Sequence, residues 1–304
     1  MKIPRVSVTT FRWFALASFL SMLLIIATGA AVRLTGSGLG CPDWPTCYQG
    51  QISGSWSLHP AIEYANRMVT VALCLVTLAT LLAATRRVPY RRDLVAFAGL
   101  LVVGVVADAV LGAVVVYTKL NPWLVASHLI LSLAMVVAGA VLYHRSKYQY
   151  GEGARADRRN PRMALIARLL WIPFIGTVIA GTMTTGSGPH AGSSRGQLRA
   201  RRLPFALHDA AWLHSLFAVL FLALILGLFL LLWKSAAPER LQRGVRRLLL
   251  IGAAQGAVGF IQYFAHLPVL LVEIHVCLAA SLTIGVTQFH LSQTARDREI
   301  GLEK

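Results

Sequence analysis

Long stretches of apolar residues, separated by shorter polar segments, dominate the chain. Eight such stretches can be marked, near Phe11 to Val32, Ile62 to Ala84, Leu94 to Val116, Pro122 to Tyr143, Met163 to Met183, Phe205 to Trp233, Leu248 to Phe264 and Leu267 to Phe289. Most reach the roughly 20 residues that an α-helix needs to cross about 30 Å of hydrocarbon, so the pattern predicts eight transmembrane helices. The first stretch is too long for the apolar part of a signal peptide and has no A-x-A-like site close behind it, so we expect it to be retained.

The composition agrees with a chain that is surrounded mostly by lipid, because 56% of its 304 residues are hydrophobic and 13% are charged. Of the 29 lysines and arginines, 22 fall near the two termini or in the turns that follow the second, fourth and sixth stretches. Basic loops resist translocation, so we expect a multi-pass protein of the bacterial cell membrane with both termini cytoplasmic. The net charge of +17 then reflects this asymmetry and attraction to anionic lipid, and no basic patch interleaved with aromatic residues indicates nucleic acid.

Two of the four cysteines flank a short segment with two prolines, CPDWPTC at residues 41–47, on the side predicted to face outward. Thiols can be oxidised outside the cytoplasm, and a bond between Cys41 and Cys47 would close a small ring worth roughly 2 kcal/mol on the loop-entropy model. We therefore expect a disulfide here, with a pair of free thiols as the alternative. Cys74 and Cys277 lie inside apolar stretches and are expected to be packing residues.

The chain also contains an internal repeat. The sequence TGSG occurs at residues 35–38 and again at 185–188, each time at the outer end of the first span of a four-span set. A second match has a constant offset of 147 and no gap: Asp108, Gly112 and His128 align with Gln255, Gly259 and His275. The two matches together indicate that the halves of the chain are related.

The repeat predicts the architecture. Four spans per half is an even number, so the halves enter the membrane in the same direction and are related by an axis along the membrane normal. We expect an all-α polytopic membrane protein whose eight transmembrane helices form two pseudo-symmetric four-helix bundles. Residues 1–148 would form the N-terminal bundle, 149–162 a cytoplasmic linker and 163–304 the C-terminal bundle.

Three histidines, His128, His214 and His275, lie within apolar stretches at shallow depth beneath the predicted outer surface. A buried imidazole is costly in lipid unless it has a partner. His214 and His275 fall on the second and fourth helices of one bundle and could hold a haem iron from both sides, as in four-helix-bundle cytochromes. The alternative is that each is a core residue hydrogen-bonded to a neighbouring helix.

The N-terminal bundle breaks the symmetry. At an offset of 148 the position that matches His214 is Asn66, within IEYANR, where Glu63, Asn66 and Arg67 share one helix face. Asparagine is a poor ligand for haem iron, so a haem held by His128 would have one side open for a reaction or for water. Alternatively, Glu63 and Arg67 form only a shallow ion pair at the start of a helix.

Taken together, these motifs resemble the haem A synthase family. Their order is GAAVRLTGSGLGCPDWPTC, IEYANR and NPWLVASHL, followed by a second half with TGSG, WLH and EIH, and the resemblance covers almost the whole chain. It implies an oxidoreductase of cytochrome oxidase biogenesis that converts haem O to haem A by oxidising the C8 methyl group of the porphyrin to a formyl group. It also implies haem O as the substrate in the N-terminal bundle and a retained haem b in the C-terminal one.

The resemblance assigns roles to residues at matching positions. The essential carboxylate falls on Glu63, the N-terminal haem ligand on His128, and the haem b pair on His214 and His275. The outer-loop disulfide of the family falls on the cysteine pair described above. The chain departs from many members at Asn66, where they carry a histidine, so six-coordinate binding of the substrate haem is not implied.

Haem would supply the oxidising chemistry, while the protein would supply orientation and a nearby charge. We expect Glu63 to relay protons or to stabilise positive charge on the methyl carbon, and Arg67 to pair with a haem propionate. Expected partners are haem O synthase, cytochrome oxidase assembly factors and a quinol or other membrane electron donor. Two other functions stay open: a diheme cytochrome that oxidises quinol, which predicts histidine pairs in both bundles, and a non-catalytic haem-handling assembly protein, which needs no carboxylate beside the porphyrin.

Overall fold

The computed structural model of the chain describes residues 5–48, 57–149, 161–193, 200–235, 237–294 and 298–299. The helices are α1 (Val8–Leu34), α2 (Leu58–Arg86), α3 (Arg92–Tyr117), α4 (Pro122–Ser146), α5 (Pro161–Leu169), α6 (Trp171–Ser187), α7 (Leu207–Lys234), α8 (Glu239–Phe264) and α9 (Val269–Thr294). With α5 and α6 taken as one span, eight helical segments are long and apolar enough to cross a membrane. The protein is therefore a multi-pass membrane protein, as the apolar pattern predicts.

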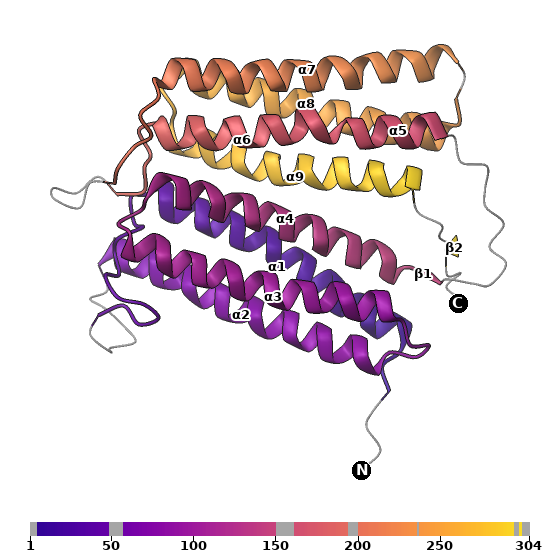
Figure 1. Ribbon diagram of the computed structural model, residues 1–304, viewed down its shortest axis with the longest axis horizontal. Coiled ribbons are helices and arrows are strands. Elements are labelled where there is room, and N and C mark those ends of the chain that lie inside the picture. The colour runs from indigo at the N-terminus through magenta and orange to yellow at the C-terminus, as the bar shows by residue number, and fades with distance from the viewer. Residues whose placement is uncertain are drawn as a thin grey trace.

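The helices form two four-helix bundles that lie side by side (Figure 1). In the first bundle, α1 and α3 each pack against both α2 and α4. In the second, α7 packs against α6 and α8, and α9 packs against α8 and α5. The bundles meet where α9 packs against α1 and α4, and where α6 packs against α4. The predicted pair of four-helix bundles is confirmed.

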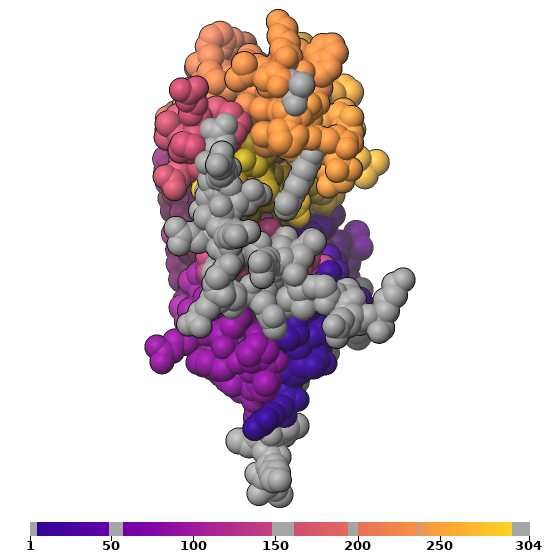
Figure 2. Space-filling view, turned by 90° about the vertical axis from the view of Figure 1, so that its right-hand side faces the viewer, coloured from indigo at the N-terminus to yellow at the C-terminus, as the bar shows by residue number. Residues whose placement is uncertain are grey.

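The chain enters and leaves the molecule at the same end of the bundles, and the cysteine-containing turn after α1 lies at the other end (Figure 1). Figure 2 looks onto the end with the termini and shows the first half, from indigo to magenta, beneath the second half, from pink to yellow. At this end the two-residue strand β1 (Tyr148–Gln149) pairs antiparallel with β2 (Arg298–Glu299). Beyond this pair, the regular structure of the described residues is helical.

The internal repeat is visible in the backbone of two turns. Between α3 and α4, Lys119 and Leu120 have φ angles of 53° and 60°, and between α8 and α9, His266 and Leu267 have φ angles of 63° and 61°. Residues other than glycine rarely adopt this left-handed conformation. The two pairs are separated by the same offset as the sequence repeat, so the halves share a helix–turn–helix geometry at this point.

Two of the differences between the helices and the apolar stretches have a clear physical reason. Helix α8 begins at Glu239 rather than at Leu248. Its first turns are polar and therefore lie outside the apolar stretch. Within them, Arg243 Nε lies 3.8 Å from Glu239 Oε1, one helical turn away. The fifth span is divided into α5 and α6. Pro173 has no N–H group to donate to the carbonyl of Leu169, so one helical hydrogen bond is missing where the two segments meet.

Each bundle has its own apolar core. The fully buried residues Phe11 and Leu101 belong to the first core, which Ala280 of α9 joins from the other bundle. Phe221 and Ile225 belong to the second core. Many large apolar side chains on the outer helix faces are exposed, as expected for a surface that is covered by lipid.

Candidate functional site

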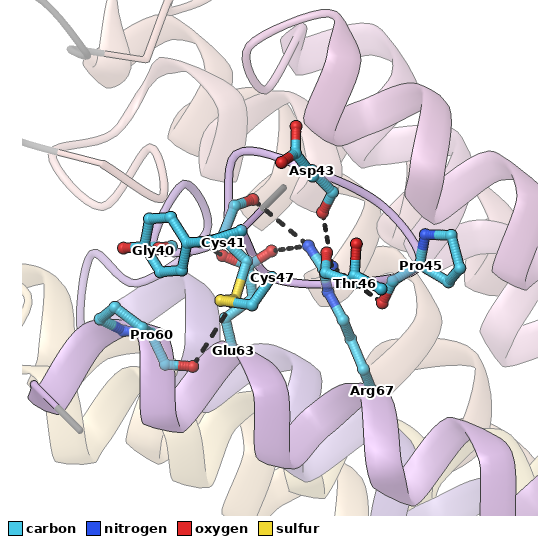
Figure 3. The surroundings of a disulfide bond; sticks show 10 residues. Gly40, Cys41, Asp43, Pro45, Thr46, Cys47, Pro60, Glu63 and Arg67 are labelled. Carbon is cyan, nitrogen blue, oxygen red and sulfur yellow. Dashed lines mark hydrogen bonds and ion pairs between the residues drawn. A yellow bond between two sulfur atoms is a disulfide. The ribbon is translucent and has the colours of Figure 1, made fainter. Parts of the chain in front are cut away.

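The segment CPDWPTC folds over the first turns of α2 (Figure 3). Cys41 and Cys47 form a disulfide and both are fully buried, so the predicted bond is confirmed. The loop approaches α2 closely, since a Cβ atom on Gly40 would lie 2.7 Å from the carbonyl carbon of His59. Only glycine fits at this position without displacing the backbone of the helix.

Glu63 connects the loop to α2. Its Oε2 accepts a hydrogen bond from the backbone N–H of Cys41 at 2.8 Å, and its Oε1 lies 2.6 Å from Nη2 of Arg67. The residue is only 4% exposed. The ion pair between Glu63 and Arg67 is therefore present, and the same carboxylate also anchors the disulfide loop.

The guanidinium group of Arg67 binds backbone carbonyl oxygens of the disulfide loop (Figure 3). Its two terminal nitrogens donate to four carbonyl oxygens: Asp43 at 2.6 Å, Thr46 at 2.8 Å, Pro45 at 3.3 Å and Cys41 at 3.3 Å. Together with Glu63, these acceptors engage both terminal nitrogens of the guanidinium. Arg67 thus orders the disulfide loop, and its contact with a haem propionate stays a prediction.

Asn66 lies on α2 between these two residues and faces α1. Its Oδ1 accepts a 2.7 Å hydrogen bond from Oγ1 of Thr28. A Cβ atom on Gly29, the next residue of α1, would lie 4.0 Å from the same oxygen. Helix α1 therefore passes close to Asn66 and fixes the orientation of its amide.

His128 of α4 points toward α3. Its Nδ1 lies 2.7 Å from Oδ1 of Asp108, and Oγ of Ser132 donates a 2.6 Å hydrogen bond to the other carboxylate oxygen, Oδ2. Gly112 of α3 lies against the ring, since a Cβ atom there would be 3.5 Å from Cε1. The side chain of His128 is 40% exposed, so the imidazole is supported on one side and accessible on another.

His214 of α7 and His275 of α9 face each other in the second bundle. Their ring centroids are 6.1 Å apart and the ring planes are inclined at 72°. Nδ1 of His214 lies 2.9 Å from the carbonyl oxygen of Thr177 on α6, which places the ring proton on Nδ1 and leaves Nε2 for a ligand. Nε2 of His275 lies 3.2 Å from Nε2 of Gln255 on α8.

The second bundle fits a haem held by two histidines. Two metal–nitrogen bonds of about 2 Å, plus roughly 1 Å from each nitrogen to its ring centre, require ring centres about 6 Å apart, and the observed distance is 6.1 Å. Glycines leave room beside the rings, because a Cβ atom on Gly181 or Gly259 would approach a ring Cε1 to 3.0 Å. Haem iron needs only two protein ligands, so the lack of a cluster of three metal-binding side chains among the described residues does not conflict with this fit.

Several partners of the predicted site residues could not be predicted from the sequence. The repeat includes Asp108 but says nothing of its contact with His128. Thr28 and Thr177, which bond Asn66 and His214, carry no sequence signal because threonines occur throughout the apolar helices. The repeat does single out Asp108, because Gln255 in the second half has the same spacing from His275 as Asp108 has from His128.

Comparison with known proteins gives a consistent result. Residues 12–55 and 58–287 match a family described as cytochrome oxidase assembly protein. The chain is also similar to three proteins named heme A synthase. The one from Lysinibacillus sphaericus is 31% identical over 132 residues, 43% of each chain. The one from Shewanella oneidensis is 27% identical over 192 residues, 58% of this chain and 57% of the relative.

The third relative, from Bacillus licheniformis, is 24% identical over 202 residues, 65% of this chain and 64% of the relative. The chain thus spans between 43% and 64% of the length of these relatives. The family match is longer and includes the disulfide loop and all of the predicted haem ligands. Because this match covers most of its length, the chain belongs to the family of cytochrome oxidase assembly proteins.

Proposed function

We propose that this protein is a haem A synthase, an oxidoreductase that oxidises the C8 methyl group of haem O to a formyl group. The observation that carries the proposal is the difference between the bundles. The second holds a facing pair, His214 and His275, whereas the first has His128 at one of the two matching positions and Asn66 at the other. A cytochrome that only transfers electrons between two equivalent haems does not need this difference. Family membership and the names of the relatives support the proposal.

The two bundles have different tasks under this proposal. The C-terminal bundle, residues 163–304, retains haem b between His214 and His275. The N-terminal bundle, residues 1–148, binds haem O through His128, and residues 149–162 link the two. The bound haem supplies the redox chemistry. The protein holds the porphyrin and leaves one of its faces without a histidine.

Glu63 is the proposed catalytic group of the N-terminal bundle. It relays a proton or stabilises positive charge on the methyl carbon. Its burial and the two hydrogen bonds to its carboxylate support this role, because a fixed charge in a buried, low-dielectric position acts more strongly than one in solvent. Arg67 keeps the carboxylate in place. It is also proposed to meet a haem propionate, which would replace some of the carbonyl oxygens that its terminal nitrogens contact.

The site lies at the end of the molecule opposite the termini. With both termini in the cytoplasm of a bacterial cell, the disulfide loop and the predicted haem ligands lie toward the outer face of the membrane. The disulfide supports this orientation, since such bonds persist in oxidising compartments. Haem O synthase and other oxidase assembly factors are proposed partners, and a quinol or another membrane donor is the proposed source of electrons.

Haem extraction tests the function directly. The chain is expressed in cells that make haem O but lack a haem A synthase of their own, and the extracted haems are identified by mass. We expect haem A with the intact chain and none with His128→Ala. Recovery of two haems without any formyl product would favour the diheme cytochrome, and failure to retain haem b would favour a haem-handling protein.

A further inference from the structure

Asp108 and His128 form a carboxylate–imidazole pair between α3 and α4. Nδ1 of the ring lies 2.7 Å from Oδ1 of the carboxylate. Both atoms are shielded from solvent, and neither meets the full geometry of a hydrogen bond with any described residue. The other carboxylate oxygen accepts the 2.6 Å hydrogen bond from Ser132.

The distance indicates where the ring proton lies. An unprotonated ring nitrogen and an ionised carboxylate oxygen would repel each other through their lone pairs at 2.7 Å, so one of the two atoms carries a proton, although the groups are not aligned for a hydrogen bond. With Asp108 ionised, this proton is on Nδ1, and the lone pair needed by a metal ligand is then on Nε2. Ser132 holds the second carboxylate oxygen and so limits rotation of the group.

The matching position in the second half has no charge. Gln255 stands at the position of Asp108 at the offset of 147, and its Nε2 lies 3.2 Å from Nε2 of His275, whereas Asp108 contacts the other ring nitrogen, Nδ1, of His128. The amide can present either its oxygen or its nitrogen to the ring, but it remains neutral in both cases. Ala279 stands where the first half has Ser132, so the hydroxyl that orients the carboxylate is also missing.

We propose that Asp108 is a positioning residue that makes His128 a stronger electron donor to iron than His275 and thereby makes the two haem sites electronically different. The inference rests on the proposed function, because it takes His128 as the iron ligand of the N-terminal bundle. It goes beyond that function by assigning a role to a residue outside the predicted ligand set.

The physical reason is the charge of the acceptor. A carboxylate that accepts the Nδ1–H bond of a metal-bound histidine fixes the ring and raises its basicity. A more basic ligand stabilises ferric iron more than ferrous iron, so the reduction potential of the haem falls. A neutral amide gives a weaker effect, because hydrogen bonds to ionised groups are roughly twice as strong as those between neutral groups. The haem in the N-terminal bundle should therefore have a lower potential than a neutral partner would give it.

The test compares the full-length chain with Asp108→Asn, both purified in lipid nanodiscs and loaded with iron protoporphyrin IX. Asparagine keeps the size of the side chain and removes its charge. We expect the iron–histidine stretching band of the N-terminal haem to move to lower frequency in resonance Raman spectra. Its midpoint potential should rise by the equivalent of at least a tenfold change in the ferrous-to-ferric ratio, about 59 mV for one electron. The low-spin haem of the C-terminal bundle serves as an internal reference and should not change.

A matched variant in the other half makes the opposite change. Gln255→Glu keeps the size of the side chain and adds a charge beside His275, so we expect the potential of the low-spin haem to fall while the N-terminal haem stays the same. Asp108→Glu retains the carboxylate and should stay closer to the unmodified chain than Asp108→Asn does. A purely structural link between α3 and α4 would predict lower thermal stability without any of these spectroscopic changes.

Three results would overturn the inference. If Asp108→Asn binds haem with an unchanged band and potential, Asp108 does not tune His128, while the proposed function is unaffected. If both haems shift equally, the cause is a general change in the protein and not this pair. If the unmodified chain and His128→Ala show the same haem spectra, His128 holds no haem, and the inference fails together with the proposed function.

Discussion

At the scale of single residues, Glu63 is the position where a catalytic and a structural role make different predictions. If its carboxylate takes part in oxidising the methyl group, Glu63→Gln should lower conversion of haem O by at least about 100-fold, the usual scale for losing a positioned acid–base or electrostatic group. Haem O or a half-oxidised alcohol should then accumulate. Mass analysis of extracted haem measures this directly.

The contacts of Glu63 require a control for stability. Glu63 and Arg67 have side chains only 6% and 10% exposed, so breaking their ion pair leaves a buried charge and costs on the order of 3 kcal/mol, more than a surface pair would. Arg67→Met breaks the same pair from the other side. A larger loss of turnover in Glu63→Gln than in Arg67→Met would assign a chemical role to the carboxylate itself, whereas an equal loss would show only that the pair as a whole is needed. Near-normal haem A output from Glu63→Gln would remove it from the mechanism altogether.

A second prediction at this scale concerns His214 and His275. Because the two rings are spaced for one iron atom between them, replacing either by alanine should reduce the low-spin haem b signal and leave the protein mostly folded. Absorption and electron paramagnetic resonance spectra of the purified variants measure this signal. An unchanged signal in both variants would show that haem b lies elsewhere.

The kinds of residue in the site could be predicted from the sequence, but most of their partners could not. A histidine in an apolar helix is conspicuous, because lipid offers it nothing to bond with. Its partner depends on how neighbouring helices are rotated and shifted relative to each other, and a single sequence does not record this. The bond from Cys41 to Glu63 is of this kind. For Asp108, the repeat singles out the residue but does not indicate its contact with His128.

At the scale of helices and loops, the spans are readily predicted because a membrane imposes a minimum length on each apolar stretch. The error at the start of α8 has the same origin. Hydropathy reports where lipid begins, whereas a helix continues as long as its backbone bonds and side-chain pairs allow, which here extends to Glu239. The break at Pro173 was missed because the apolar pattern runs through it without interruption.

The disulfide loop gives the prediction at this scale. Replacing Cys41 and Cys47 by serine should lower the free energy of unfolding by about 2 kcal/mol, the loop-entropy value for so short a ring. The loop should still fold over α2, because Arg67 and Glu63 hold its backbone. Thermal unfolding with and without a reductant measures the effect: reductant should lower the midpoint of the intact chain and not that of the double variant.

The two cysteines within the helices provide the control for this measurement. Cys74 and Cys277 are free thiols in the structure, so Cys74→Ser should respond to the reductant as the unmodified chain does. Labelling of Cys41 or Cys47 by a thiol reagent in intact, unreduced protein would contradict the bond.

At the scale of the whole molecule, the repeat predicts two bundles but not how they divide their tasks. Equal turns at Lys119–Leu120 and His266–Leu267 show that the halves share a backbone plan. The differences are in a few side chains: Asn66 against His214, and Asp108 against Gln255. Under the proposed function, the duplicated frame places two haems side by side, and these few substitutions decide which of them is retained and which is accessible to a reaction.

The orientation of the whole molecule is the last prediction. Most basic residues belong to the segments at the end where α1 begins and α9 ends, and a disulfide lies at the other end. Both features independently predict that the termini are cytoplasmic. Green fluorescent protein fused after Lys304 should therefore fluoresce, and alkaline phosphatase fused there should be inactive. The matched control is a fusion after Leu120, in the turn between α3 and α4, where the two reporters should behave in the opposite way. Active phosphatase at Lys304 would contradict this orientation. It would show that the disulfide loop and the predicted haem ligands lie on the cytoplasmic side.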